Sequence, residues 1–153
     1  MFKVLIAVDG SPSTERALAL TTALLSGKEV EARLLHVIPR HLIFGGRGPV
    51  VAESYDLEQV RRDCQAFLAT CAQRLQQEGV GPHIKTELAA GDPADIILAA
   101  AEKDQTDLII LGRRGLNAMQ RFLQGSVSTK VVAQAPCAVL VADSPDGATS
   151  SGP

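Results

Sequence analysis

The stretch that decides the fold runs from Asp107 to Ser128 and reads DLIILGRRGLNAMQRFLQGSVS. Its opening apolar run is typical of a strand buried in a parallel sheet. Glycines at 112, 115 and 125 follow, and a helix is predicted to begin at Gly125-Ser126. Backbone N–H groups at a helix N-terminus attract an anion, glycines allow close approach, and Arg113, Arg114 and Arg121 add positive charge. The stretch therefore predicts a phosphate-binding loop.

Strands and helices are predicted to alternate along the rest of the chain. Pro12 and Pro93 are expected at first helical positions, with Ser11 and Asp92 as the preceding caps. This alternation predicts an α/β domain with a parallel sheet and helices on both faces. The expected strands are 2–9, 30–38, 83–90, 107–111 and 136–142, and the expected helices are 12–26, 55–79, one that starts at 93, and 126–134.

Ligands of such sheets bind beyond the carboxyl ends of the strands, where the strand order reverses. The loops after the first and fourth strands carry the most polar, glycine-bearing chemistry. If these two strands are neighbours, Asp9 faces the segment from Gly112 to Ser128.

Composition excludes several classes of protein. The 153 residues suit one domain, and the net charge of −2 without a long basic tract argues against a nucleic-acid coat protein. No apolar run reaches the ~20 residues that span a bilayer. The chain opens directly on what reads as a core strand rather than a signal peptide. The three cysteines, Cys64, Cys71 and Cys137, lack C-x-x-C spacing, so we expect a reducing, cytoplasmic location.

With these residues in view, the chain resembles a nucleotide-binding universal stress protein. That family's signature is Gly, two residues, Gly, nine residues, then Gly followed by Ser or Thr, and Gly112, Gly115 and Gly125-Ser126 meet it. Six blocks in the expected order carry the resemblance over residues 2–142: VLIAVDGS, LLHV, GDPADII, DLIILGRRG, GSVS and PCAVLVAD.

The resemblance implies a three-layer, doubly wound domain over residues 1–143 with a five-stranded parallel sheet of order 3-2-1-4-5. It also implies a dimer, and ATP held between the ends of strands one, two and four. The residues at 144–153 are small and polar, which predicts a disordered tail.

Site residues follow from the same resemblance, position by position. Asp9 would lie near a phosphate-bound Mg²⁺, and Val37 would contact adenine through its backbone. The loop at 40–54 departs from the family's pattern. The implied ligand-binding residues are Ala7, Val8 and Asp9 along the site, Val37 at the base, Gly112, Arg113, Arg114, Gly115, Leu116 and Asn117 around ribose and phosphates, and Gly125, Ser126, Val127 and Ser128 as phosphate donors.

Taken alone, several of these residues have a second interpretation. The glycines also fit a plain strand-to-helix loop. Asp9 is either a turn and cap residue or, facing phosphates, a group that requires a divalent ion between the two negative charges. Arg114, held between two glycines, is the best phosphate contact, whereas Arg121 is expected on the surface. His36 is expected to be a strand residue with a satisfied ring nitrogen.

The last strand should lie at a sheet edge without a charged residue to protect it. Either helices cover it, or Val139 to Val141 meet a second copy of the chain. The resemblance favours this dimer through residues 137–142.

The leading functional hypothesis is an ATP-binding regulatory protein of the stress response, with nucleotide as a switch and with an unidentified protein partner. No catalytic residue is assigned, and neither nucleic acid nor membrane is expected as a partner. The alternative is a slow ATPase or phosphotransferase, but no general base is assignable other than Asp9, which the metal would occupy. A receiver-like signalling domain is disfavoured because strand one ends without a second acid.

Overall fold

A computed structural model describes residues 1–40, 57–113 and 126–143. Strands and helices alternate through these residues as the sequence predicts. In chain order they are β1 (Phe2–Ala7), α1 (Pro12–Leu25), β2 (Val30–Pro39), α3 (Leu57–Gln77), β3 (His83–Gly91), α4 (Pro93–Asp104), β4 (Leu108–Gly112), α5 (Ser126–Gln134) and β5 (Ala138–Ala142).

The strands form one five-stranded sheet in the order β3-β2-β1-β4-β5, and every neighbouring pair is parallel. This confirms the predicted fold class and strand order. β1 lies at the centre, where Ala7 is opposite Leu35 of β2 on one side and Leu111 of β4 on the other. β5 pairs only with β4 among the described strands, so it forms one edge of the sheet.

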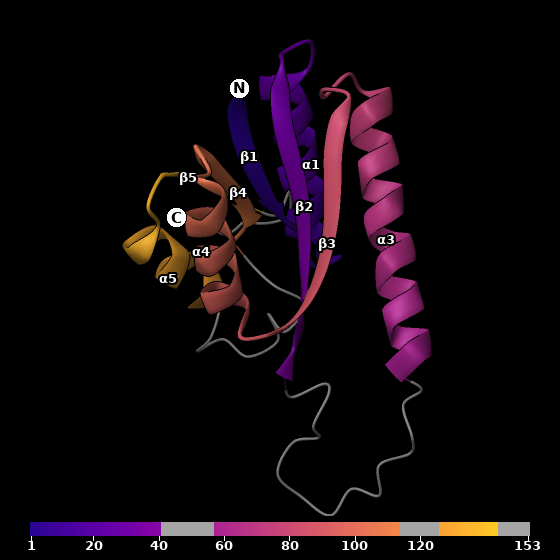
Figure 1. The fold of residues 1–153 in the computed structure, drawn as a ribbon, viewed down its shortest axis with the longest axis vertical. Coiled ribbons are helices and arrows are strands. Elements are labelled where there is room, and N and C mark those ends of the chain that lie inside the picture. Colours follow the sequence, from indigo (N-terminus) through magenta and orange to yellow (C-terminus); the bar gives the residue numbers. More distant parts are fainter. Residues whose placement is uncertain (41–56, 114–125, 144–153) are drawn as a thin grey trace, which may run out of the picture.

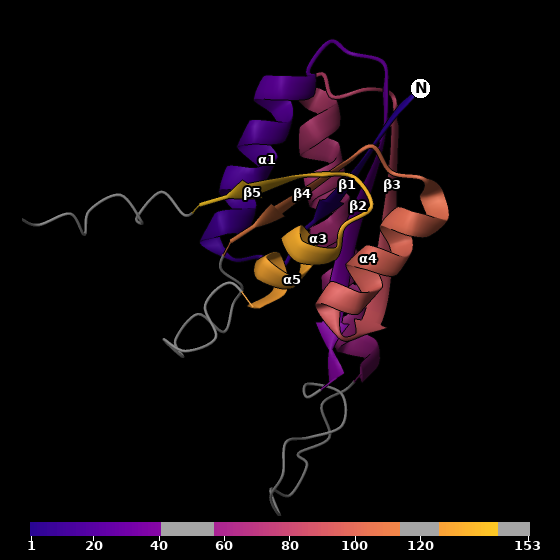
Figure 2. The same cartoon turned by 90° about the vertical axis from the view of Figure 1, so that its left-hand side faces the viewer.

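Helices cover both faces of the sheet, which gives the three predicted layers (Figures 1 and 2). On the face of α1 and α3, Ile6, Leu34 and Ile110 are buried against Leu18 and Leu75. On the opposite face, the alternate strand residues pack with Ile97 of α4 and Val131 of α5. Successive strand residues are buried in the cores on opposite faces of the sheet, which explains why the strands are apolar almost throughout.

Both proline-started helices begin where the sequence predicts, but their caps differ. The Asp92 carboxylate accepts a hydrogen bond from the Asp95 amide at 3.0 Å, as expected of an N-cap. Ser11 occupies the corresponding position before α1, yet its side chain makes no cap hydrogen bond. Its hydroxyl instead pairs with the Ser13 hydroxyl at 3.0 Å. The expected cap role of Ser11 is therefore only positional.

The apolar side chains of α3 are buried only along part of the helix. Leu68, Cys71 and Leu75 are buried, but Leu57 at the start of the helix is 51% exposed. The buried side chains are those that reach the sheet and α1, and Leu57 lies beyond that contact.

None of the described helices has both the length and the apolar character needed to cross a membrane.

Polar contacts join α1 and α3 outside the core. Arg74 of α3 pairs with Glu15 of α1 and, at 3.1 Å, with Glu78. The Thr22 hydroxyl of α1 donates to the other Glu78 oxygen. These contacts hold the two helices in fixed relation over one face of the sheet.

Candidate functional site

The strand order reverses between β1 and β4, at the centre of the sheet. The chain proceeds outward through β2 and β3 on one side, then returns to β4 and β5 on the other. Ligand sites of open α/β sheets occur at this point, beyond the carboxyl ends of the strands. Ala7 and Leu111 are paired there, so the residues that follow them, Val8-Asp9 and Gly112-Arg113, emerge side by side.

Asp9 organises the turn between β1 and α1. Its Oδ1 accepts hydrogen bonds from the Ser11 amide at 3.0 Å and from the Thr14 hydroxyl at 2.9 Å. The Asp9 amide in turn donates to the Thr14 hydroxyl oxygen at 3.0 Å. Among the described residues Oδ2 accepts no hydrogen bond. Asp9 thus acts as a turn residue through Oδ1, and its other oxygen has no partner among the described residues.

Gly112 is packed closely against the first turn of α1. A Cβ at this position would lie 2.2 Å from Ser13 Oγ and 2.7 Å from Ser13 Cβ. Only a residue without a side chain fits there, whether or not a ligand is bound. The sequence pattern did not indicate this role, because it depends on how α1 sits against β4.

Residues on both sides of the segment 114–125 are in contact. The buried Ser128 hydroxyl, in the first turn of α5, donates to the Arg113 carbonyl at 3.3 Å. The N-terminus of α5 is therefore held beside the end of β4, with Ser126 exposed and Val127 half-buried. Arg114, Gly115, Leu116, Asn117, Arg121 and Gly125 lie outside the described residues.

Arg113 lies at the carboxyl end of β4, on the side next to β5. Its amide donates to the Ala142 carbonyl at 2.8 Å, and its guanidinium is 3.3 Å from both oxygens of Asp143. The Arg113 side chain is 59% exposed, so this ion pair is a weak restraint that a stronger anion can replace.

His36 lies near the carboxyl end of β2, on the other side of β1 from β4. Its ring nitrogen Nδ1 is 2.7 Å from the Val8 carbonyl, which confirms the predicted satisfied nitrogen. The ring also meets Phe67 of α3 edge-on, with centroids 5.8 Å apart. Val37 follows it and is buried, paired with Ala89 of β3.

Sequence reasoning missed Ser13, Thr14 and Phe67 at this site. The run of hydroxyl residues after Asp9-Gly10 was the only signal for the first two.

Comparison with known proteins identifies the family of this chain. The model of the universal stress protein family matches residues 1–143. This chain belongs to the universal stress protein family. A universal stress protein of Thermus aquaticus is 34% identical over 145 residues, spanning 92% of this chain and 98% of the relative.

Solved structures of the family share the fold. Universal stress protein UspA from Lactobacillus plantarum has a TM-score of 0.66 at 28% identity, over 92% of this chain and 97% of its own. A universal stress protein family member from Arabidopsis thaliana, solved with AMP bound, has a TM-score of 0.66 at 24% identity, over 94% and 92% of the two chains.

The residues described at this family site fit Mg²⁺ only as a phosphate-bound ion. Within the described ranges no three His, Cys, Asp or Glu side chains converge on a metal position. Mg²⁺ usually takes one or two carboxylates and completes its octahedron with phosphates and water. The unused oxygen of Asp9 satisfies that requirement, whereas a cage built by the protein alone is not present in this part of the chain.

The cysteines of this family member are not part of the site. All three are free, and burial raises the pKa of the Cys64, Cys71 and Cys137 thiols above the ordinary value. A raised pKa keeps them as neutral thiols near pH 7, which disfavours nucleophilic or redox chemistry.

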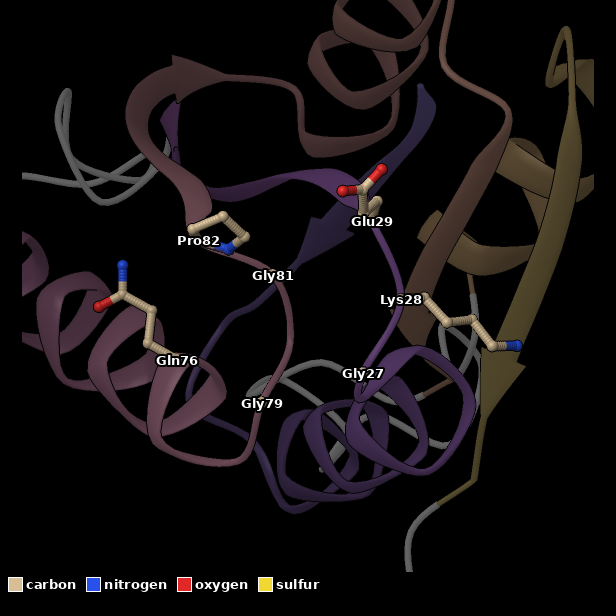
Figure 3. A pocket seen from close by; sticks show the side chains of 7 residues that line it. All are labelled: Gly27, Lys28, Glu29, Gln76, Gly79, Gly81 and Pro82. Atoms are coloured by element: carbon tan, nitrogen blue, oxygen red, sulfur yellow. The ribbon is translucent and has the colours of Figure 1, made fainter.

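A hollow of about 630 Å³ lies at the amino ends of β2 and β3, opposite the end where the candidate site lies (Figure 3). It lies between the α1–β2 and α3–β3 turns, and the Lys28 side chain extends away from the glycines that line it. The turn amides are already used: Gly27 donates to the Gly79 carbonyl at 2.9 Å, and Gly81 donates to the same oxygen at 3.1 Å. These two glycine amides are therefore not available to a ligand in this hollow.

Proposed function

We propose that this protein binds ATP with Mg²⁺ at the carboxyl edge of β1, β2 and β4, and that the nucleotide acts as a switch in a cytoplasmic stress response. The observation that carries the proposal is the contact between Ser128 and Arg113. It places the N-terminus of α5 beside the ends of β1 and β4, where the strand order reverses. Helix N-terminus, glycine-bearing loop and Asp9 are the three parts that a metal-bound polyphosphate requires.

Each sequence-derived ligand residue has a role in this proposal. Ala7 and Val8 line the floor, Val37 contacts the base, and Asp9 holds the phosphate-bound metal through its unused oxygen. Mg²⁺ would neutralise phosphate charge beside that carboxylate. Phosphates would meet the α5 N-terminus at Gly125, Ser126, Val127 and Ser128. Gly112, Arg113, Arg114, Gly115, Leu116 and Asn117 would surround the ribose and phosphates.

The family likeness supports an adenine nucleotide as the ligand class. The Arabidopsis relative of the same fold carries AMP. Val37 and His36, near the carboxyl end of β2, would lie at the adenine end of the site. This likeness supports adenine as the base, and titration with ATP, ADP and AMP tests the number of phosphates.

Binding without rapid turnover is the proposed mode of action. The described carboxylate at the site, Asp9, is committed through Oδ1 to Ser11 and Thr14 and through Oδ2 to the metal. It is therefore unsuited to act as a general base that positions an attacking water. The alternative, a slow ATPase or phosphotransferase, predicts steady release of phosphate.

We extend the proposal to the whole assembly. Residues 1–143 form the nucleotide-binding domain, and two copies pair through the open edge of β5. Val141 is 37% exposed on that edge, and Val132 of the neighbouring α5 is 56% exposed. A shallow hollow of about 410 Å³ lies between them. The free thiols fit the reducing cytoplasm.

Ser126 gives the sharpest test, because it is exposed at the first position of α5. Ser126→Asp places a negative charge where phosphates would lie. Near a helix N-terminus the same charge stabilises the fold by about 0.3–1 kcal/mol. Ser126→Asn is the neutral control. Calorimetric titration of nucleotide-stripped protein with ATP, ADP and AMP, each with Mg²⁺, measures affinity, and urea unfolding measures stability.

We expect the parent and Ser126→Asn to bind ATP, and Ser126→Asp to bind at least about tenfold more weakly while being at least as stable as the parent. Equal ATP affinity in Ser126→Asp and Ser126→Asn would contradict phosphate binding at α5. Parallel assay of phosphate release decides between switch and enzyme: sustained release by the parent that Ser126→Asp abolishes would establish turnover.

A further inference from the structure

The hydrogen-bond ladder between β1 and β2 stops one step earlier than its geometry allows. The Val8 amide donates to the Leu35 carbonyl at 2.9 Å, so Leu35 directs its backbone groups toward β1. Alternate residues of a strand direct their N–H and C=O groups to the same neighbouring strand. Val37 is the next residue of β2 to face β1, and its natural acceptor is the Val8 carbonyl.

His36 occupies that acceptor. Its Nδ1 lies 2.7 Å from the Val8 oxygen, and because a carbonyl only accepts, Nδ1 carries the hydrogen. The His36 ring also packs edge-on against Phe67, with the two ring centroids 5.8 Å apart. Among the turn and loop hydrogen bonds of the described residues, none uses the Val37 amide. At the last rung of the ladder, the Val8 carbonyl thus accepts a hydrogen bond from a side chain and none from the Val37 amide.

As a consequence, none of the described strands lies opposite the backbone of Val37 on the side that faces the site. β1 ends at Ala7, so beyond Val8 both the N–H and the C=O of Val37 face the space that β1 has left. Val37 is only 8% exposed. Within the described residues the Val37 amide has no hydrogen-bond acceptor, and a buried amide without an acceptor is costly unless a ligand supplies one.

We propose that His36 is a positioning residue for base recognition: by holding the Val8 carbonyl, it keeps the Val37 amide out of the ladder and available to adenine. The identity of the ligand rests on the proposed function. Adenine presents a ring-nitrogen acceptor, N1, next to its amino donor, which complements a backbone N–H and C=O. Hypoxanthine, the base of ITP, presents N1–H next to a carbonyl oxygen, which reverses the pattern.

The first experiment measures the amide itself, without nucleotide. Native-state hydrogen exchange by NMR compares the Val37 and Leu35 amides in the parent, in His36→Phe and in His36→Asn. Phenylalanine keeps the ring against Phe67 but removes the donor, whereas the asparagine side-chain amide retains a donor at the place of Nδ1. A ring with a merely structural role would leave the Val37 exchange rate of His36→Phe unchanged.

We expect Val37 to exchange about tenfold or more faster than Leu35 in the parent and in His36→Asn, and to slow to the Leu35 rate in His36→Phe as the ladder closes. Equal protection of Val37 and Leu35 in the parent would overturn the proposal, as would unchanged Val37 exchange in His36→Phe. If His36→Phe does not fold, the parent and His36→Asn still decide, because slow Val37 exchange in either one contradicts the displaced ladder.

The second experiment measures base preference by titration with ATP and ITP, each with Mg²⁺. Loss of one hydrogen bond should weaken ATP binding about three- to tenfold in His36→Phe while ITP changes little, with ATP affinity recovered in His36→Asn. Equal losses for both nucleotides would overturn base recognition. If the parent binds no nucleotide while its Val37 exchange is fast, the adenine assignment and the proposed function fail together, and the displacement by His36 stands.

Discussion

Ser13 lies so close to Gly112 that no side chain fits between α1 and the end of β4: a Cβ at residue 112 would lie 2.2 Å from Ser13 Oγ. The first glycine of the family signature therefore has a packing role in the protein itself. Its backbone also ends β4 where the strand order reverses, so the proposed ligand contact would share this position with the packing role.

Gly112→Ala should destabilise the fold by about 1–3 kcal/mol, because overpacking forces α1 or β4 to shift. Urea unfolding measures the change. The double variant Ser13→Gly/Gly112→Ala removes the two nearest contacts and leaves the Ser13 backbone carbon at 3.1 Å. We expect the double variant to be less destabilised than the sum of its two single changes. Simple additivity would mean that the Gly112 requirement lies elsewhere.

Asp9→Asn and Asp9→Ala should separate the turn role of Asp9 from its charge. Asparagine retains an oxygen acceptor for Ser11 and Thr14, so its stability should stay within about 0.5 kcal/mol of the parent, whereas alanine leaves two donors unpaired and costs about 1–3 kcal/mol.

The proposed metal role of Asp9 should show itself only with nucleotide. In Asp9→Asn, calorimetry should show about tenfold weaker ATP binding with Mg²⁺ and little change when EDTA removes the metal. A loss of the same size with and without Mg²⁺ would exclude metal binding by this carboxylate.

Glu78 should make stability depend on pH in the acid range. The hydrogen bond from Thr22, followed by the contact with Arg74, lowers the pKa of this carboxyl below its ordinary 4.5. A lower pKa in the folded than in the unfolded state stabilises the fold above the unfolded value, and this contribution is lost as pH falls through the folded value.

The matching variant is Glu78→Gln, with Glu29→Gln as an exposed control. Because the Glu78 side chain is 35% exposed, solvent screening limits the expected loss to about 0.5–1 kcal/mol at pH 7. Urea unfolding between pH 7 and pH 3 should show that the difference in the free energy of unfolding between the parent and Glu78→Gln disappears below pH 4.5. A difference independent of pH would refute the electrostatic cause.

Val141→Lys should abolish the proposed dimer, because a lysine on an edge strand blocks pairing with a second copy. Sedimentation velocity would show a dimeric parent and a monomeric variant of unchanged secondary structure. Leu24→Lys changes another exposed apolar residue, 42% accessible on α1, and should stay dimeric. A monomeric parent, or a dimer that survives Val141→Lys, would rule out pairing through β5.

The sequence by itself determined the alternation of strands and helices, because apolar runs and glycine or proline breaks are local patterns. It also determined the family, through the spacing of Gly112, Gly115 and Gly125. Contacts between distant segments could not be predicted from it. The fit of Ser13 against Gly112, the contact of Ser128 with Arg113 and the bond of His36 to Val8 exist only once α1, α3 and α5 pack on the sheet. The exposure of Leu57 has the same origin, since a periodic apolar face does not state how much of a helix its neighbours cover.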